Sequence, residues 1–345
     1  MTTTSVILGG ARTPIGRFGS SLASLAAVDL GAVAIREALA RSGVEAASVD
    51  YVVMGQVLQA GTGQITARQA AIAAGLPREV PAITINKVCL SGLNAVAMAD
   101  QMIRAGEADI VVAGGMESMS QAPYLLPKAR EGLRIGDGQV VDSLIHDGLW
   151  STFTKQHMGE SSDAINRELG ITRAEQDAWA ARSHRRAAAA WESGVLAEEV
   201  VAVEVPGKGG PTVVERDEGV RADTTVEKLG ALRPAFVEGG TITAGNASGV
   251  NDGAAALLIA SEAAVKKHNL KPYARITGMA SAGVPPRVMG IGPVPSTQKL
   301  MARLNLKIGD FDVIELNEAF ASQALACMRQ LGLPDDAEHV NPHGG

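Results

Sequence analysis

The sequence has little of several residue types, and each shortage argues against a class of protein. Its 345 residues include 2 cysteines, and aromatic residues make up only 3%. Two cysteines cannot build a disulfide framework, so we expect a reducing, cytoplasmic location. Few rings and a net charge of −6 argue against a nucleic-acid partner. No apolar run is long enough to cross a bilayer, and the first residues do not resemble a signal peptide, so we expect no membrane partner.

What the sequence does contain is typical of an α/β protein. Hydrophobic residues make up 46% of the chain, enough for a large core. Strand-like and helical runs alternate along the chain. We expect strands over residues 6–8, 52–54, 82–86, 109–113 (closed by Gly114 and Gly115), 254–260 and 313–316, and helices over 26–42, 67–74, 91–104 and 172–193. Residues 116–251 form an excursion rich in loops, and a second α/β unit is expected to begin at Arg275.

One local pattern occurs twice in the sequence. Ala40-Arg41 precedes Asp50 and a strand, as Ala302-Arg303 precedes Asp312 and another apolar run. An internal duplication explains this match. A chance match between two helix–loop–strand segments explains it equally well.

Cys89 is the first candidate for chemistry. It lies between the strand at 82–86 and the helix at 91–104, where free backbone N–H groups and the helix dipole stabilise a thiolate. Such positions lower a cysteine pKa from about 8.5 to between roughly 3.5 and 7.5. A sharp strand-to-helix turn also exposes the side chain, as in other nucleophile elbows. A buried structural thiol is the competing interpretation.

Other polar residues are less specific. The glycines near residue 114 lack the spacing of dinucleotide or triphosphate sites, and the six histidines show no metal-ligand spacing, so we expect no metal. Asn317 is expected to open a helix, where it either caps the helix or donates its amide to a developing oxyanion. Cys327 lies on an apolar helix face and is predicted to be core packing.

Six segments in chain order together resemble the thiolase family, and within it the short-chain acetoacetyl-CoA branch. They span residues 10–16, 86–92, 114–120, 156–159, 243–255 and 317–320. The resemblance implies a thiolase-like α/β fold of two related βαβαβ halves in layers, with an inserted loop domain and an incomplete second half. The implied division is an N-terminal half (1–120), a loop domain covering CoA (121–250), a return to the N-terminal half (251–273) and a truncated C-terminal half (274–345).

The resemblance also implies an activity, that of an acetyl-CoA C-acetyltransferase. Its acyl transfer is ping-pong, through a thioester on Cys89, with acyl-CoA and CoA as substrates and no cofactor. A homotetramer and a role in fatty-acid metabolism are implied as well. The alternatives are a condensing enzyme of the ketoacyl-synthase type and an inactive acyl-CoA-binding fragment.

Matched residue by residue, the resemblance assigns a role to each position of the site. Cys89 is the acylated nucleophile, and Asn317 orients a water in an oxyanion hole. His157 and Met158 match the pantetheine and acyl pocket, and Ala319 and Phe320 line the same pocket. The remaining positions match residues that line the CoA site: Leu149, Arg221, Phe236, Ala244, Gly245, Ser248 and Met289.

The family pattern continues beyond the Asn-x-x-Gly-Gly segment at 341–345. It includes a Gly-His-Pro turn, whose histidine deprotonates the nucleophile, and a Cys-x-Gly segment that moves the α-proton. The resemblance therefore implies a C-terminal truncation. We expect these 345 residues alone to expose apolar faces and, without that base, to catalyse thiolysis very weakly. A monodisperse chain that cleaves acetoacetyl-CoA rapidly would contradict both expectations.

Overall fold

Interleaved segments of the chain build two compact units in the structure, a computed structural model that describes residues 4–345. The first unit comprises Met1–Gly148, Glu199–Gly219 and Val250–Thr277, and the second comprises Leu149–Glu198, Val220–Gly249 and Gly278–Gly345. The four-part division inferred from the sequence stays a prediction.

A seven-stranded mixed sheet forms the centre of the first unit. Its order is β13–β1–β12–β5–β3–β4, and β2 pairs with β12. β3 is parallel to β4 and to β5, whereas the other neighbours are antiparallel. The strands are β1 (Ser5–Arg12), β2 (Gly16–Arg17), β3 (Tyr51–Gly55), β4 (Ala82–Ile85), β5 (Ile110–Ser118), β12 (Asn251–Ser261) and β13 (Ala274–Arg275).

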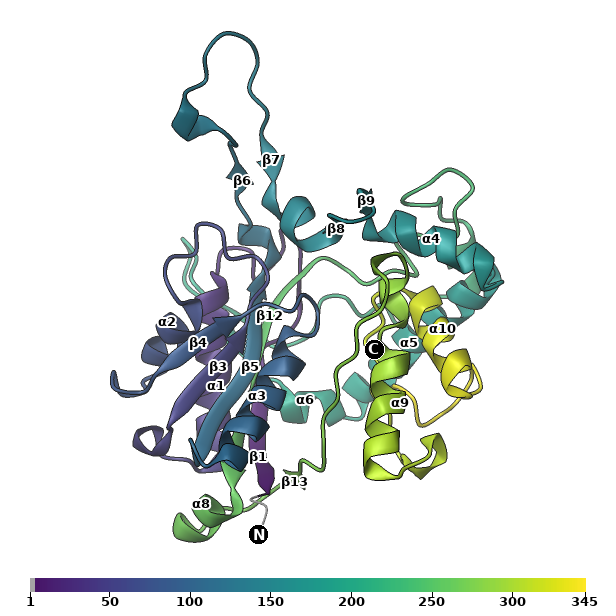
Figure 1. Cartoon of the computed structure of the whole chain (residues 1–345). Helices are drawn as coiled ribbons and strands as arrows, with labels where there is room; N and C mark the ends of the chain where they lie inside the picture. The colour runs from purple at the N-terminus through teal and green to yellow at the C-terminus, as the bar shows by residue number, and fades with distance from the viewer. Residues whose placement is uncertain (1–3) are drawn as a thin grey trace. The chain divides into compact units, whose positions relative to one another are not determined.

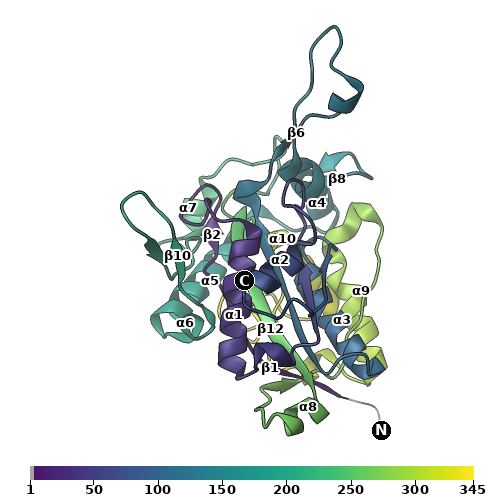
Figure 2. The same cartoon turned by 90° about the vertical axis from the view of Figure 1, so that its left-hand side faces the viewer.

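Three helices, α1 (Ala27–Ser42), α2 (Thr66–Ala73) and α3 (Ser91–Ala105), cover this sheet. Consecutive residues of a strand point to opposite faces. In β5, a Cβ on Gly115 would lie 3.5 Å from Gly92 of α3, whereas the side chain of Met116 packs against Gly31 of α1. α1 and α3 therefore cover opposite faces of the sheet (Figure 1). Figure 2 shows α1 running beside β1 and β12; α1 packs against these two strands and against α2.

The first half of the chain follows the predicted order of elements, and the helix and strand positions agree within a few residues. Two expectations about this unit were wrong. β5 does not end at Gly114: it continues to Ser118, and the missing side chain of Gly114 lets the backbone at Ala255 of β12 approach closely. Arg275 does not begin a second α/β unit, because it belongs to β13, which pairs with β1.

Shorter elements complete the first unit. The hairpin of β6 (Tyr124–Leu125) and β7 (Val141–Asp142) projects away from the sheet, and Ile135 near its tip is fully exposed (Figure 1). The others are the 3-10 helices η1 (Ala46–Ser48), η2 (Met119–Gln121) and η3 (Ala129–Glu131), the pair β10 (Val203–Val205) and β11 (Thr212–Val214), and α8 (Glu262–Lys267). Two further elements, the π-helix η4 (Leu144–Leu149) and α6 (Val195–Glu199), lie where the chain passes from one unit to the other.

The second unit is mainly helical and packs around α10 (Ala321–Leu331). The first eight residues of α10 are buried, and its core partners include Trp179 of α5. The other elements are β8 (Trp150–Ser151), β9 (Gln156–His157), α4 (Met158–Glu168), α5 (Arg173–Glu192), α7 (Val226–Gly230), η5 (Pro286–Ile291), α9 (Pro293–Leu304) and η6 (Ile308–Asp310). The strand expected at 313–316 is absent from the described residues, where Ile314 makes only an isolated parallel bridge to Val340.

The two halves of the chain follow the same local path. α1 ends at left-handed Gly43 and α9 ends at left-handed Asn305, and a short 3-10 helix begins three residues after each cap. A parallel pairing comes next, between Val52 and Ala82 in the first half and between Ile314 and Val340 in the second. This agreement of caps, 3-10 turns and pairing favours the duplication over a chance match.

Within residues 4–345, no helix is both long and apolar enough to cross a membrane.

We predict that Gly55→Ala disturbs the start of α3. A Cβ at Gly55 would lie 2.5 Å from Cβ of Ser91 and 2.9 Å from the backbone nitrogen of Gly92. Such overpacking destabilises proteins by about 1–3 kcal/mol, so the free energy of unfolding in urea should fall by that amount. Gly9→Ala is the matched control, since its new Cβ would meet Ser42 at an ordinary 3.6 Å. Equal stability of the two variants would contradict this account.

Candidate active site

Cys89 lies in the tight turn between β4 and α3, and its residue is exposed. The preceding residue, Val88, has a left-handed φ of 52°, which is unfavourable for a β-branched side chain. Side chains on both sides hold this turn. The Asn86 Oδ1 accepts from the Val88 N–H at 2.9 Å, and Ser91 Oγ accepts from the Lys87 N–H at 2.8 Å and donates to the Val88 carbonyl at 2.6 Å. These bonds therefore hold the exposed residue Cys89 in a fixed position at the start of α3.

Glu117 of β5 supports the same turn from the sheet. Its carboxylate accepts from the N–H groups of Val57 at 2.8 Å and Leu58 at 3.3 Å. The Val57 carbonyl in turn accepts from the Asn86 amide at 3.3 Å. Burial raises the pKa of Glu117, while these backbone donors oppose the rise.

The expected fall in the pKa of the Cys89 thiol is wrong. Desolvation raises this pKa above its ordinary value of 9.0, and a backbone hydrogen bond offsets only part of the rise. The expectation rested on the α3 dipole and left out the desolvation of the thiol. With its pKa raised, Cys89 is a neutral thiol at neutral pH.

Several predicted substrate residues of the second unit form one aromatic cluster. The rings of His157 and Phe236 stack with centroids 4.7 Å apart, and Phe236 meets Phe320 edge-on at 6.1 Å. Gly159 must lack a side chain, because a Cβ there would overlap the Phe236 ring. Burial lowers the pKa of His157, and its Nδ1 accepts from the Gly159 N–H at 3.2 Å. His157 is thus a neutral, flat, partly apolar surface at neutral pH.

A polar network fixes the loop that carries Ala244, Gly245 and Ser248. The buried Asn246 side chain accepts from the Thr243 N–H at 2.8 Å and donates to Asp177 at 3.0 Å. The backbone then joins this loop to the segment before α10. The Ser248 N–H donates to the Ala319 carbonyl at 3.0 Å, and the Ala321 N–H donates to the Asn246 carbonyl at 2.9 Å. Ser248, Ala319 and Phe320 are therefore brought together.

Asn317 is exposed and lies in an extended segment before α10. It does not open that helix, as the sequence suggested, because α10 begins at Ala321 and Phe320 occupies the cap position. The capping interpretation of Asn317 is therefore wrong.

The remaining predicted residues are more scattered. Leu149 ends the π-helix η4, Met158 begins α4, and Met289 of η5 is 46% exposed. Arg221 is exposed, and its N–H donates to His184 Nδ1 at 3.3 Å. Cys89 belongs to the first unit and all the other predicted site residues belong to the second.

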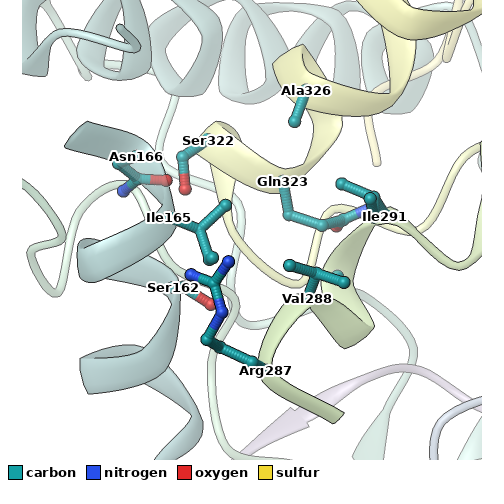
Figure 3. A pocket seen from close by; sticks show the side chains of 10 residues that line it. Ser162, Ile165, Asn166, Arg287, Val288, Ile291, Ser322, Gln323 and Ala326 are labelled. Carbon is teal, nitrogen blue, oxygen red and sulfur yellow. The ribbon is translucent and has the colours of Figure 1, made fainter. Parts of the chain in front are cut away.

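A small pocket of the second unit lies between α4, η5 and α10 (Figure 3). Apolar side chains such as Ile165 and Val288 form part of its wall, and Arg287 lies beside them. Two of its polar atoms, Ser322 Oγ and Gln323 Oε1, are buried and have no hydrogen-bond partner in the described chain. The loop residues Val288 and Gly290 that line it flank Met289.

Sequence reasoning missed the residues that frame the site. Ser91 and Asn246 stood inside recognised segments, yet nothing in the sequence revealed which backbone groups they bind. Asp163 was not singled out at all, although its carboxylate accepts from the N–H groups of Thr241 and Ile242. Asn341 belonged to a quoted segment without a role, and its bonds reach Leu316, 25 residues away. Such long-range partners have no signal in spacing alone.

Comparison with known proteins decides the family. The model of the thiolase N-terminal domain matches residues 5–263, and the model of the thiolase C-terminal domain matches residues 270–345. The chain belongs to the thiolase family. The thiolase-like α/β fold expected from the resemblance is confirmed, and its central sheet is mixed.

Curated thiolases resemble this chain over nearly its whole length. An acetyl-CoA acetyltransferase of Cupriavidus necator is 51% identical over 99% of this chain and 86% of that protein. An acetyl-CoA acetyltransferase of Escherichia coli is 52% identical over the same shares. A beta-ketoadipyl-CoA thiolase of Pseudomonas aeruginosa is 49% identical over 97% of this chain and 85% of that protein.

Residues 4–345 contain no group of three or more His, Cys, Asp or Glu side chains placed to hold a metal ion.

We predict that alkylation of this thiolase at Cys89 accelerates steadily with pH. Only the thiolate reacts, and the thiolate fraction rises about tenfold per pH unit below the pKa. With the pKa raised above 9.0, the iodoacetamide rate constant should keep rising from pH 6 to pH 9 without a plateau. Peptide mass spectrometry follows the reaction at Cys89, while buried Cys327, whose pKa burial raises to about 11, serves as the internal control. A plateau below pH 7 would show that the helix dipole prevails.

Proposed function

We propose that this thiolase is an acetyl-CoA C-acetyltransferase that transfers acyl groups through a thioester on Cys89. The observation that carries the proposal is the agreement of two features. Relatives with about half of their residues identical bear the name acetyl-CoA acetyltransferase. In this chain, the exposed Cys89 occupies a strained turn at the start of a helix, the position of a nucleophile.

The proposed reaction has two halves. The Cys89 sulfur attacks the carbonyl carbon of an acyl-CoA, the bond from that carbon to the CoA sulfur breaks, and CoA leaves as the thiol after taking up a proton. A second acetyl-CoA then loses an α-proton and its carbon attacks the acyl-Cys89 thioester, which releases 3-ketoacyl-CoA and free Cys89. In the reverse direction, CoA cleaves 3-ketoacyl-CoA. Each half passes through an oxyanion that needs fixed donors.

The state of the thiol supports one feature of this chemistry. Because burial raises its pKa, Cys89 is not a resting thiolate at neutral pH. The proton must therefore leave as the sulfur attacks, which calls for a general base within hydrogen-bond reach. Asn317 is proposed to orient the water of an oxyanion hole.

The substrate-binding roles are proposals for the second unit. The stacked His157–Phe236 pair and Phe320 are suited to the uncharged pantetheine arm, since together they form an apolar aromatic surface. Met158 and Ala319 are proposed for the same pocket. The other proposed CoA-lining positions are Leu149, Arg221, Ala244, Gly245, Ser248 and Met289.

The proposal extends to the setting of the reaction. It uses no cofactor, because the CoA thioester is itself the activated substrate. A cytoplasmic role in fatty-acid metabolism is proposed, and the two free cysteines support the location. A homotetramer is proposed as well, supported by exposed apolar side chains on the β6–β7 hairpin, among them Ile135 and Leu133.

Thiolysis of acetoacetyl-CoA tests the proposal. We expect Cys89→Ser to reduce kcat at least about 10³-fold, since loss of a catalytic nucleophile removes the covalent route. Cys327→Ala should retain kcat within a few-fold, because Cys327 is buried in the packing of α10. The protein concentration in the assay is set high enough to measure slow thiolysis by the unchanged chain. Equal activity of the Cys89→Ser variant and the unchanged chain would refute the role of Cys89.

Alternative substrates separate the neighbouring functions. Preference for β-ketoadipyl-CoA would assign the chain to the activity named for its Pseudomonas aeruginosa relative. Dependence on a malonyl donor would favour a ketoacyl-synthase type of condensation. Binding of acetyl-CoA without turnover would favour an inactive acyl-CoA-binding protein.

A further inference from the structure

The side chain of Asn341 makes an unusually complete set of hydrogen bonds on either side of Asn317. Its Oδ1 accepts from the Leu316 N–H at 2.7 Å, and its Nδ2 donates to the Leu316 carbonyl and to Glu318 Oε1, each at 2.8 Å. Both neighbours of Asn317 are thus bound by one amide. Asn341 is only 1% exposed, so water competes weakly for these bonds.

We infer that Asn341 is a positioning residue for Asn317, which it fixes through the backbone of Leu316 and the side chain of Glu318. The inference rests on the proposed function, in which Asn317 orients an oxyanion-hole water. Asn341 itself need not touch substrate.

The amide replaces strand pairing that this part of the chain lacks. In the first half, β3 and β4 pair over four residues, from Val52 with Ala82 to Gly55 with Ile85. In the second half, the Ile314 N–H donates to the His339 carbonyl and the Asn341 N–H donates to the Ile314 carbonyl, each at 2.9 Å. Backbone pairing between the described residues then stops. The Asn341 side chain presents the same donor and acceptor pair as a peptide group and carries the pairing on to Leu316.

A strained backbone orients the side chain of Asn341. Asn341 has a left-handed φ of 46°, which asparagine tolerates better than other residues with a side chain. Arg186 of α5 donates to the carbonyls of Val340 at 2.6 Å and Asn341 at 3.2 Å, which holds the peptide in this conformation. The strain persists because surrounding bonds determine it, as is common near functional groups.

Two substitutions test this role. Asn341→Gly keeps the left-handed backbone and removes the amide. Asn341→Asp keeps an acceptor for the Leu316 N–H but replaces the donor with a carboxylate oxygen, facing the Leu316 carbonyl and Glu318. Asn305→Gly is the matched control, because Asn305 is exposed, has a φ of 55° and caps α9 in the same unit.

Three measurements separate positioning from general damage. Hydrogen exchange reports the Leu316 amide, steady-state thiolysis of acetoacetyl-CoA gives kcat and KM, and iodoacetamide reports Cys89. In Asn341→Gly we expect exchange at Leu316 to rise at least about tenfold, since its acceptor is lost, and in Asn341→Asp repulsion of the new carboxylate by the Leu316 carbonyl and Glu318 should raise it as well. We expect kcat to fall about 10- to 100-fold, with KM changed by less than about twofold. Cys89 alkylation, and all values for Asn305→Gly, should match the unchanged chain.

Each other outcome has a definite meaning. Unchanged exchange at Leu316, an unchanged kcat despite faster exchange, or a rise in KM that accounts for the loss would each overturn the inference. Faster alkylation of Cys89 and of buried Cys327, in parallel with the loss of kcat, would show general unfolding and overturn it too. A last outcome is that the unchanged chain shows no thiolysis while the Leu316 exchange responds as expected. In that case the hydrogen bonds of Asn341 hold Leu316 as inferred, but the proposed function fails, and with it the inferred effect of Asn341 on catalysis.

Discussion

The turn that carries Cys89 in the first unit depends on one strained residue, Val88. Its left-handed backbone costs about 1–3 kcal/mol, and it persists only because Asn86 and Ser91 hold the peptides around it. Gly55 lets α3 come close enough to the sheet for Ser91 to make those bonds, because a Cβ there would lie 2.5 Å from the Ser91 Cβ. If any of these supports relaxed, Val88 would return to an extended conformation and Cys89 would leave the start of α3.

Each half has a left-handed residue after its parallel pairing. Val88 lies three residues after the end of β4 at Ile85, whereas Asn341 directly follows Val340. The first turn presents the proposed nucleophile directly. The second acts on its neighbours, since the Asn341 amide binds the backbone of Leu316 and the side chain of Glu318, which flank Asn317.

Alternation of apolar and polar residues, with glycine and proline as stop signals, was sufficient to predict most elements of the first unit. These signals failed at Gly114, where the glycine allows the close approach of the β12 backbone and does not end the strand. They also failed at β13, an edge strand too short to have a pattern of its own. The strand expected at 313–316 has the right composition but little pairing, because its partner segment contributes one bridge only. The pairing partner of a strand, unlike its periodicity, cannot be identified from the residues next to it in the sequence.

Motif resemblance selected His157, Phe236 and Phe320, and the structure brings these three rings together, the first two stacked and the third edge-on. The position of Cys89 at the start of a helix predicted the wrong direction for its pKa, because desolvation depends on atoms that lie far apart in the sequence. The supporting bonds of Asn341 were invisible for the same reason.

The central claim is that Cys89 at the strained turn accepts the acyl group. Its most direct test is peptide mapping by mass spectrometry after the chain is mixed with acetyl-CoA alone and quenched in acid. We expect one acetyl group on the peptide containing Cys89, removed again when free CoA is added before the quench. Acetylation at Cys327 or at another residue, or none at Cys89 under conditions where acetyl-CoA is bound, would contradict it.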